Sequence, residues 1–385
     1  MKKRGFSTRA IHGRGLPAAP GEPVVQPVVT ATTFSFDDAA TFARVMSEEE
    51  YGFLYSRLRN PTVEELNRVL ADLEGAEAAQ AFGSGMAAIS AALMTNLEPG
   101  DTLLCAQQLY GATYAFAEQR LKLLGVEIVH LDVTDHAAWR RPARVRYVET
   151  MSNPGLPVAD LEAIAATKGE GLMIVDNTFA SPALCRPLEF GADIVCESAT
   201  KYLNGHHDVT AGVLAGNSEV VGRARAWQID TGAVLDAFPA YLLRRGLKTL
   251  SLRMERHCEN AVGLARFLEG RERVERVYYA GLESYPQHDL ARRQLAGPGG
   301  MVAVELSGGR EAGEAFMDNL ELAKRATSLG GVDTVVSHPA STSHRQFSEE
   351  QLEAAGVTPG LLRVSVGCED ADDIVADFGN ALDRL

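Results

Sequence analysis

Short apolar runs alternate with segments of helical periodicity between residues 61 and 248. From Pro61 the apolar residues recur every three or four positions, which predicts a helix, and further helices are expected from Met86 and over 114–124. The runs that predict strands lie at 79–82, 101–105, 126–129, 144–149, 172–176, 193–196 and 211–214. Because strands that alternate with helices form parallel sheets, this region predicts an α/β fold with a mostly parallel, doubly wound sheet.

The regions on either side have a different pattern. Residues 1–60 are rich in Pro, Gly and Ala and predict an irregular, extended N-terminal arm. In the C-terminal region one long helix is expected from Leu247 through Leu264. Strands should follow at 274–278, 301–306 and 361–366, before a last amphipathic helix over 370–385. We therefore expect an arm (1–60), a large domain (61–248) and a smaller C-terminal α/β domain (249–385).

Composition excludes several classes of function. A chain of 385 residues is too long for one compact core, which favours two domains. Its formal net charge of −14 disfavours nucleic acid and anionic membranes as partners, and no apolar stretch approaches membrane-spanning length. The basic start lacks the apolar segment of a secretory signal, and the five cysteines form no CxxC pair, so a reducing cytoplasm is expected. The histidines lack the spacing of zinc ligands, so no metal site is expected.

Two of the predicted strands end in reactive side chains. The run at 193–196 is followed by Ser198, Thr200 and Lys201, and the run at 172–176 ends in Asp176. Ligands of open α/β sheets bind at the carboxyl ends of the strands. A lysine, a carboxylate and two hydroxyls placed there could hold an aldehyde, a ring nitrogen and a phosphate together, and pyridoxal phosphate carries all three.

The chemistry of these two residues fits that cofactor. A lysine at a strand end can be desolvated, which lowers its pKa and gives the neutral amine that condenses with a carbonyl. An ionised aspartate beside the pyridine nitrogen keeps that nitrogen protonated, so the ring accepts electrons. The alternatives are a surface lysine at 201 and a helix N-cap at Asp176. The joint position of the two residues beside two hydroxyls favours the cofactor.

Three further features each have two interpretations. Gly83–Ala88 matches G-x-G-x-x-A between a strand and a helix, so it is a tight turn, a phosphate site or a dinucleotide fingerprint. Tyr110 follows the run at 101–105 and is either a half-buried aromatic at a turn or a ring stacked on a planar cofactor. Arg363 is a charge inside an apolar strand pattern, so it needs a carboxylate from a structural aspartate or from a substrate.

Eight short motifs resemble one enzyme family. They lie at 55–62 (YSRLRNPT), 84–86 (SGM), 109–111 (LYG), 149–154, 175–178 (VDNT), 198–202 (SATKY), 328–331 (SLGG) and 363–367 (RVSVG). Through them the chain, from about Phe6 to its C-terminus, resembles the Cys/Met-metabolism family of pyridoxal-phosphate enzymes. That family includes the cystathionine γ-synthases and γ-lyases, the methionine γ-lyases and the O-acylhomoserine sulfhydrylases. The resemblance implies an aspartate-aminotransferase-like fold of type I.

The resemblance also implies a role for each residue of the site. Lys201 and Tyr110 would be catalytic, the first as the lysine bound to the cofactor and the second as a proton donor. The implied cofactor-binding residues are Tyr55, Arg57, Ser84, Gly85, Met86, Tyr110, Asp176, Ser198, Thr200 and Lys201. Asn153, Ser328 and Arg363 would hold the substrate carboxylate. Tyr55 and Arg57 would reach the phosphate of a neighbouring subunit, which implies a homo-oligomer, usually a homotetramer built as a dimer of dimers.

The activity implied is α,γ-elimination from L-methionine or homocysteine-like substrates, which gives 2-oxobutyrate, ammonia and a thiol. Three stretches, at 245–258, 298–306 and 338–341, favour methionine as the substrate, and Thr327 stands where cystathionine enzymes tend to carry a glutamate. Ala112 and the pair Gln228–Ile229 depart from the methionine pattern, so cystathionine γ-lyase, cystathionine γ-synthase and γ-replacement on an acylated homoserine stay open. A nicotinamide-dependent oxidoreductase and a non-catalytic binding protein are alternatives from other classes.

Overall fold

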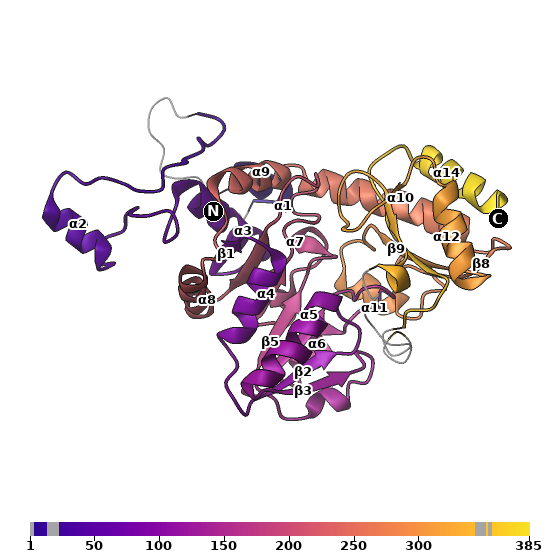
Figure 1. Cartoon of the computed structure of the whole chain (residues 1–385), viewed down its shortest axis with the longest axis horizontal. Helices are drawn as coiled ribbons and strands as arrows, with labels where there is room; N and C mark the ends of the chain where they lie inside the picture. The colour runs from indigo at the N-terminus through magenta and orange to yellow at the C-terminus, as the bar shows by residue number, and fades with distance from the viewer. Residues whose placement is uncertain (1–3, 14–22, 343–351, 353–355) are drawn as a thin grey trace.

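The computed structural model of the chain describes residues 4–13, 23–342, 352 and 356–385. These residues contain a seven-stranded sheet in the order β1-β7-β6-β5-β4-β2-β3 and a five-stranded sheet in the order β10-β11-β12-β9-β8 (Figure 1). The strands of the larger sheet are β1 (Ala78–Phe82), β2 (Thr102–Ala106), β3 (Glu127–Leu131), β4 (Val145–Glu149), β5 (Leu172–Asp176), β6 (Ile194–Glu197) and β7 (Gly212–Gly216). Those of the smaller sheet are β8 (Val274–Tyr278), β9 (Met301–Leu306), β10 (Lys324–Arg325), β11 (Val335–Ser337) and β12 (Leu361–Ser365).

The larger sheet is mostly parallel, as expected from the alternating pattern. Strands β3, β2, β4, β5 and β6 run parallel to their neighbours, whereas β7 is antiparallel to both β6 and β1. All seven strands of this sheet were predicted within a few residues. In the smaller sheet the sequence did not reveal β10 and β11, because strands of two and three residues carry too few positions to show a period.

Helices cover both sheets and connect them. They are α1 (Phe6–His12), α2 (Ala39–Met46), α3 (Pro61–Glu74), α4 (Gly85–Met94), α5 (Gly111–Phe116), α6 (Leu161–Ala165), α7 (Ser181–Leu184), α8 (Ser218–Thr231), α9 (Ala237–Leu247), α10 (Leu250–Leu268), α11 (His288–Gln294), α12 (Gly309–Asn319) and α14 (Ala371–Asp383). Helix α3 begins as its sequence predicts, with Pro61 in the first turn and the Asn60 side chain accepting from the Thr62 amide. Figure 1 shows the long helix α10 extending along the second sheet toward α14.

The structure differs from two sequence-based expectations. The stretch predicted to be irregular contains helices α1 and α2. Helix α1 is held to the body because Arg244 donates to the Ala10 and Ile11 carbonyls and pairs with Glu65, whereas α2 lies away from it (Figure 1). The division of the chain into an arm (1–60), a large domain (61–248) and a small domain (249–385) stays a prediction.

The single long helix expected through 247–264 is wrong at its start, because the chain breaks between α9 and α10. The carbonyl of Gly246 accepts from the guanidinium of Arg253 at 2.9 Å. Gly246 also packs on the loop after Lys201, where a Cβ atom would lie 2.3 Å from the Asn204 carbonyl oxygen. These contacts take the place of the hydrogen bonds that a continuous helix would make.

Two carboxyl groups meet in the core beneath the larger sheet. Glu74 ends α3, Glu197 ends β6, and both are buried. Burial raises the pKa of Glu74 to about 8 and, together with the charge of Glu74, raises that of Glu197 well above its usual range. The Asn177 amide donates to Glu197 at 2.9 Å, and the charge of Arg186 opposes the rise at Glu74. The folded pair therefore retains a proton that the unfolded chain releases.

We expect Glu74→Gln to change how stability depends on pH. Between the ordinary pKa of 4.5 and the folded value of about 8, the native chain binds more protons than the unfolded one. The free energy of unfolding must then fall as pH rises, by about 1.4 kcal/mol per pH unit for one proton. Glutamine cannot ionise, so the variant should lose much of this slope. Above pH 8 its free energy of unfolding should be larger than that of the parent chain.

Urea unfolding followed from pH 5 to 9 measures this difference. The matched control is Glu64→Gln, which changes a partly exposed glutamate on the same helix. Its curve of unfolding free energy against pH should run parallel to that of the parent chain. Parallel curves for Glu74→Gln and the parent would contradict a retained proton.

Candidate active site

A cavity of about 480 Å³ lies at the carboxyl ends of the parallel strands, beside the second sheet. Every predicted site residue lines it except Tyr55 and Arg57. The lining residues that had been predicted are Ser84, Gly85, Met86, Tyr110, Asn153, Asp176, Ser198, Thr200, Lys201, Ser328 and Arg363. Segments up to 279 residues apart in the chain thus meet at one place, because the strand ends of the large sheet lie beside the loop that carries Ser328 and the strand β12 that carries Arg363 (363 − 84 = 279).

Helix α4 presents its N-terminus to the cavity. Ser84 caps it, accepting from the Ala87 amide at 3.1 Å, so the free amides of the first turn are available for an anion. Gly85 lies so close to Ser198 that a Cβ atom there would stand 2.8 Å from the Ser198 Cβ. This close approach requires glycine and brings the Ser198 hydroxyl beside the helix N-terminus. The arrangement fits a phosphate group.

Asp176 lies at the end of β5, inside the cavity wall. Its carboxylate accepts from the Thr178 amide at 3.0 Å and from the Tyr147 hydroxyl at 3.2 Å. Burial raises the pKa of Asp176, while these hydrogen bonds and the charge of Lys201 act to lower it. A carboxylate held in this way can pair with a protonated ring nitrogen. The contact to Thr178 is a local turn, and the next helix, α7, begins only at Ser181.

Lys201 extends into the same cavity from the loop after β6. Its ammonium nitrogen lies 2.7 Å from the Ser328 hydroxyl. Burial lowers the pKa of Lys201 to about 8, the charge of Arg363 acts in the same direction, and Asp176 opposes both. A lysine with this pKa supplies an appreciable fraction of neutral amine near pH 7, which a carbonyl condensation requires.

Arg363 meets the cavity from β12 of the second sheet. Its two terminal nitrogens donate to the Asn153 side-chain oxygen at 3.0 Å and to the Ser328 carbonyl at 2.9 Å. The remaining Nε is buried without a hydrogen-bond partner, and among the described residues no carboxylate pairs with this guanidinium. Of the two partners that the sequence left open, a ligand carboxylate is therefore the one that this geometry favours.

Tyr110 lies at the mouth of the cavity, where 45% of its surface is exposed. It precedes α5, and its backbone amide donates to Glu149 at 2.6 Å. The main chain at Tyr110 is thus held in place, while its side chain lines the cavity and no hydrogen bond within the described residues occupies its hydroxyl. This geometry suits a ring that stacks on a planar ligand.

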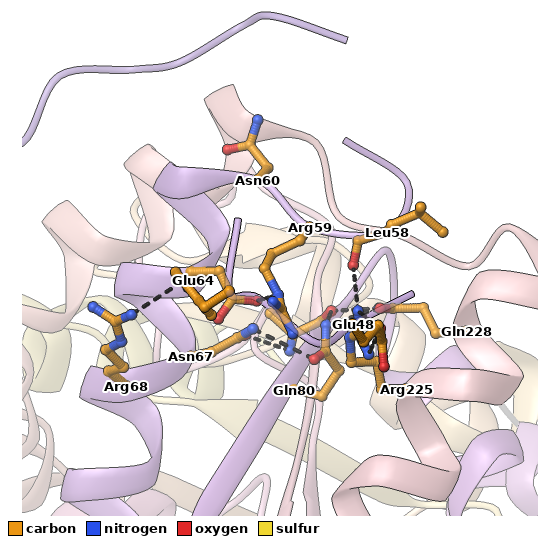
Figure 2. A network of polar contacts seen from close by, with 12 residues as sticks. Glu48, Leu58, Arg59, Asn60, Glu64, Asn67, Arg68, Gln80, Arg225 and Gln228 are labelled. Carbon is orange, nitrogen blue, oxygen red and sulfur yellow. Dashed lines mark hydrogen bonds and ion pairs between the residues drawn. The ribbon is translucent and has the colours of Figure 1, made fainter. Parts of the chain in front are cut away.

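Tyr55 and Arg57 lie outside this cavity. A guanidinium nitrogen of Arg57 donates to the Ile229 carbonyl at 2.8 Å, and 40% of the Tyr55 surface is exposed. The nearby arm residue Leu58 is held by Arg225, which donates to its carbonyl at 3.2 Å (Figure 2). Within one chain, the structure therefore does not bring these two residues to the other predicted ligands.

Gln228, a departure from the methionine pattern, also lies outside the cavity. It is buried, accepts from Gln80 at 2.8 Å and donates to the Ala81 carbonyl, while Asn67 accepts from the Ala81 amide at 2.8 Å (Figure 2). Strand β1 is at the edge of the sheet, so these side-chain amides pair the backbone groups that a further strand would pair. In this chain the residue supports the strand that leads into the Ser84 loop.

Sequence reasoning assigned no role to several polar residues of the cavity. Glu149 ends β4 and accepts from the amides of Tyr110 and Asn153, and Thr178 accepts from the Ser198 amide at 2.8 Å. Both belong to recognised motifs, but the contact from Glu149 to Tyr110 spans 39 residues and that from Thr178 to Ser198 spans 20, so only the fold reveals these two contacts. In the described part of the chain, no cluster of His, Cys, Asp and Glu could hold a metal ion.

Comparison with known proteins agrees with this geometry. The model of the family described as Cys/Met metabolism PLP-dependent enzyme matches residues 7–383. The chain belongs to this family. It is 46% identical to the L-methionine gamma-lyase of Pseudomonas putida, over 99% of this chain and 98% of that protein. It is 40% identical to the O-succinylhomoserine sulfhydrylase of Pseudomonas aeruginosa, over 92% and 90% of the two chains.

A solved structure resembles the chain over almost its whole length. Cystathionine gamma synthase from Xanthomonas oryzae pv. oryzae in complex with cystathionine has a TM-score of 0.94 and 37% identity, covering 99% of this chain and 98% of that one. The fold is accordingly that of the PLP-dependent type I enzymes, and the chain is an enzyme that depends on pyridoxal 5′-phosphate. The dinucleotide interpretation of Gly83–Ala88 is thereby replaced, and the residues of the cavity fit this cofactor.

Proposed function

We propose that this enzyme is a carbon–sulfur lyase that performs α,γ-elimination on L-methionine or homocysteine-like substrates. One molecule of methionine and one of water give 2-oxobutyrate, ammonia and methanethiol. The observation that carries the proposal is the arrangement around Arg363, whose side chain lines the same cavity as Lys201 and Tyr110 and has no carboxylate partner among the described residues. The similarity to the methionine gamma-lyase of P. putida supports it.

When bound, the cofactor supplies a carbonyl that takes up the substrate amine and a ring that accepts the electrons released at Cα. Ser84, Gly85, Met86, Ser198 and Thr200 line the part of the cavity where we place its phosphate. Asp176 would hold the ring nitrogen protonated. Tyr55 and Arg57 would complete the phosphate site of a neighbouring subunit.

Lys201 would move the protons. With a pKa lowered to about 8, its amine can accept the α-proton of a substrate whose carboxylate lies on Arg363, with Asn153 and Ser328 holding the guanidinium. The same amine can then accept a β-proton. The hydroxyl of Tyr110 would donate a proton to the departing sulfur, which leaves as a neutral thiol.

The remainder of the cavity favours a small, uncharged substrate end. Its lining includes Ala112, Met151, Phe179 and Leu329, with hydroxyl groups such as that of Thr327. Among the described lining residues the only carboxylates are Asp176 and Glu149, and both are engaged by hydrogen bonds. No free carboxylate in this part of the chain would therefore receive the distal amino group of cystathionine.

Product analysis tests the proposal directly. The purified holoenzyme, given methionine alone, should release 2-oxobutyrate and methanethiol in equal amounts. A strict requirement for an added thiol or sulfide together with an acylated homoserine would overturn elimination. That result would favour the second candidate, γ-replacement. The similarity to the O-succinylhomoserine sulfhydrylase of P. aeruginosa supports this candidate. Turnover of cystathionine in preference to methionine would identify a cystathionine enzyme instead.

We further propose that the enzyme is a homotetramer built as a dimer of dimers. Tyr55 and Arg57 do not reach the cavity of their own chain, and the surrounding arm exposes large apolar side chains, among them Val24, Phe42 and Met46. In Figure 1 the segment around α2 projects from the body, as expected if it lies against another subunit. Light scattering of the purified protein measures the oligomeric state.

A shared site makes a prediction about mixed oligomers. Lys201→Ala and Arg57→Ala should each impair both sites of a pure dimer. In a dimer of one chain of each kind, one site combines the intact Lys201 with the intact Arg57 of its neighbour, so activity should return at that site. The two differently tagged variants are co-expressed, purified over both tags and assayed. If the mixed oligomers are as inactive as the two single variants, Arg57 acts at the site of its own chain.

We also propose a cytoplasmic location. All five cysteines are free, as expected in a reducing compartment. No helix of the described residues is long and apolar enough to cross a membrane.

A further inference from the structure

Glu149 occupies an unusual position in the cavity. It ends β4 directly opposite Asp176 in the parallel register of β4 and β5, so two carboxyl groups stand side by side at the strand ends. Glu149 is 4% exposed, and among the described residues no lysine or arginine pairs with it. A buried carboxyl group beside another one is costly, so its presence here calls for a reason beyond packing.

The partners of Glu149 supply that reason. Its Oε1 accepts from the Tyr110 amide at 2.6 Å, and its Oε2 accepts from the Asn153 amide at 3.2 Å. These amides belong to two different loops, one after β2 and one after β4. A single carboxyl group therefore connects the loop of the proposed proton donor to the loop that holds the arginine of the carboxylate site.

The connection continues across the cavity. Asn153 accepts from Arg363 at 3.0 Å, Arg363 donates to the Ser328 carbonyl at 2.9 Å, and the Ser328 hydroxyl lies 2.7 Å from the nitrogen of Lys201. The hydrogen bonds thus form an unbroken chain through Tyr110, Glu149, Asn153, Arg363, Ser328 and Lys201. It ends at the amine that we propose to accept protons and, on the other side, at the backbone amide of the residue whose hydroxyl we propose to donate one.

We propose that Glu149 is a positioning residue that fixes Tyr110 and Asn153 relative to each other. The proton donor and the carboxylate site then keep one geometry while the substrate passes through successive steps. Both carboxylate oxygens are needed, because each accepts from one loop. For the role of Tyr110 this inference rests on the proposed elimination, whereas the role of Asn153 requires only that the cavity binds an amino acid.

Burial and the charge of Asp176 raise the pKa of Glu149 to about 8, while the two backbone amides lower it. The two amides favour the ionised form, in which both oxygens accept, against the effects of burial and of the neighbouring carboxyl group.

The test is a pair of double-mutant cycles on the holoenzyme. Glu149→Gln keeps the shape but has one acceptor oxygen for two amides, so it should lower elimination from methionine by about 10- to 100-fold. Tyr110→Phe removes only the hydroxyl. If Glu149 acts through Tyr110, the double variant should be little slower than Tyr110→Phe alone. The second cycle joins Glu149→Gln with Asn153→Ala and measures the binding of norleucine, which has no γ-leaving group.

A separate readout detects a purely structural role. Exchange of the α-hydrogen of norleucine with solvent deuterium needs Lys201 and the carboxylate site but not a proton donor for sulfur. Glu149→Gln should therefore lower elimination more than exchange. Glu74→Gln is the matched control, an equally buried glutamate outside the cavity, and should leave the ratio of elimination to exchange unchanged.

Additive effects in both cycles, with elimination, exchange and thermal stability falling together, would overturn the proposal. If the parent enzyme fails to release 2-oxobutyrate from methionine, the proposed function fails. The norleucine cycle then still decides the role of Glu149, since coupling to Asn153 would support it and additivity would reject it.

Discussion

Replacing Lys201 by alanine should leave a colourless protein that does not turn over methionine. The amine is the only group on the described cavity wall that can both bind an aldehyde covalently and accept the α-proton. Loss of a positioned acid–base group alone lowers turnover by about 10²- to 10⁴-fold, and loss of the covalent anchor adds to this. The measurements are the visible absorbance of the purified protein with added cofactor and the rate of 2-oxobutyrate release.

Two control variants separate the amine from its charge. Lys201→Arg keeps a cation near the Ser328 hydroxyl but cannot serve as a neutral nucleophile, so it should also be colourless and inactive. Lys324→Ala removes an exposed lysine paired with Asp333 and should behave as the parent chain. A Lys201→Ala protein that kept the absorbance band and released 2-oxobutyrate at the parental rate would mean that another residue binds the cofactor.

The sequence is informative where short apolar runs end in reactive side chains. It predicts strands β5 and β6 with Asp176 and Lys201 at their carboxyl ends, because three or four consecutive apolar residues followed by polar ones are typical of buried parallel strands. Since such ends share one edge of the sheet, the order of residues along the chain is enough to place these two side chains together. The family motifs add Arg363 of the second sheet and Ser328 of the loop between β10 and β11.

Other features depend on contacts that no local pattern encodes. Glu149 is part of a recognised motif, yet its partners Tyr110 and Asn153 become apparent only when two loops lie side by side in the fold. The break before α10 depends on Arg253 and on the loop after Lys201, which packs on Gly246. Helix α2 lies away from the body, and its eight residues follow an earlier stretch of the arm that is rich in Pro and Gly and favours an irregular arm as a whole.

The position of Gln228 in the fold was not apparent from the sequence. Its departure from the methionine pattern marks it as a residue that bears on specificity. The structure instead places its side chain in the buried row of amides beneath β1, outside the cavity lining (Figure 2). Within its own chain Gln228 therefore does not contact the substrate, whereas Ala112 and Thr327 line the cavity.

Replacing Arg363 by methionine should separate the recognition of the substrate carboxylate from the rest of binding. The guanidinium is buried at the cavity wall, and its Nε has no partner there. A charge-assisted hydrogen bond contributes roughly 1.5–3 kcal/mol, so losing a pair of them should lower kcat/KM for methionine by about 10²- to 10⁴-fold, mainly through KM. Arg363→Lys keeps the charge but lacks the planar guanidinium, so its kcat/KM should lie between those of the parent enzyme and of Arg363→Met.

The decisive comparison uses a ligand without a carboxylate. 3-(Methylthio)propylamine has the amine and thioether of methionine but cannot engage Arg363, so its inhibition constant should be nearly the same for the parent enzyme and for Arg363→Met. The preference of the parent for methionine over this amine should largely disappear in the variant. Weakening of both ligands by the same factor would instead show that Arg363 supports the cavity through Asn153 and Ser328 without contacting the substrate.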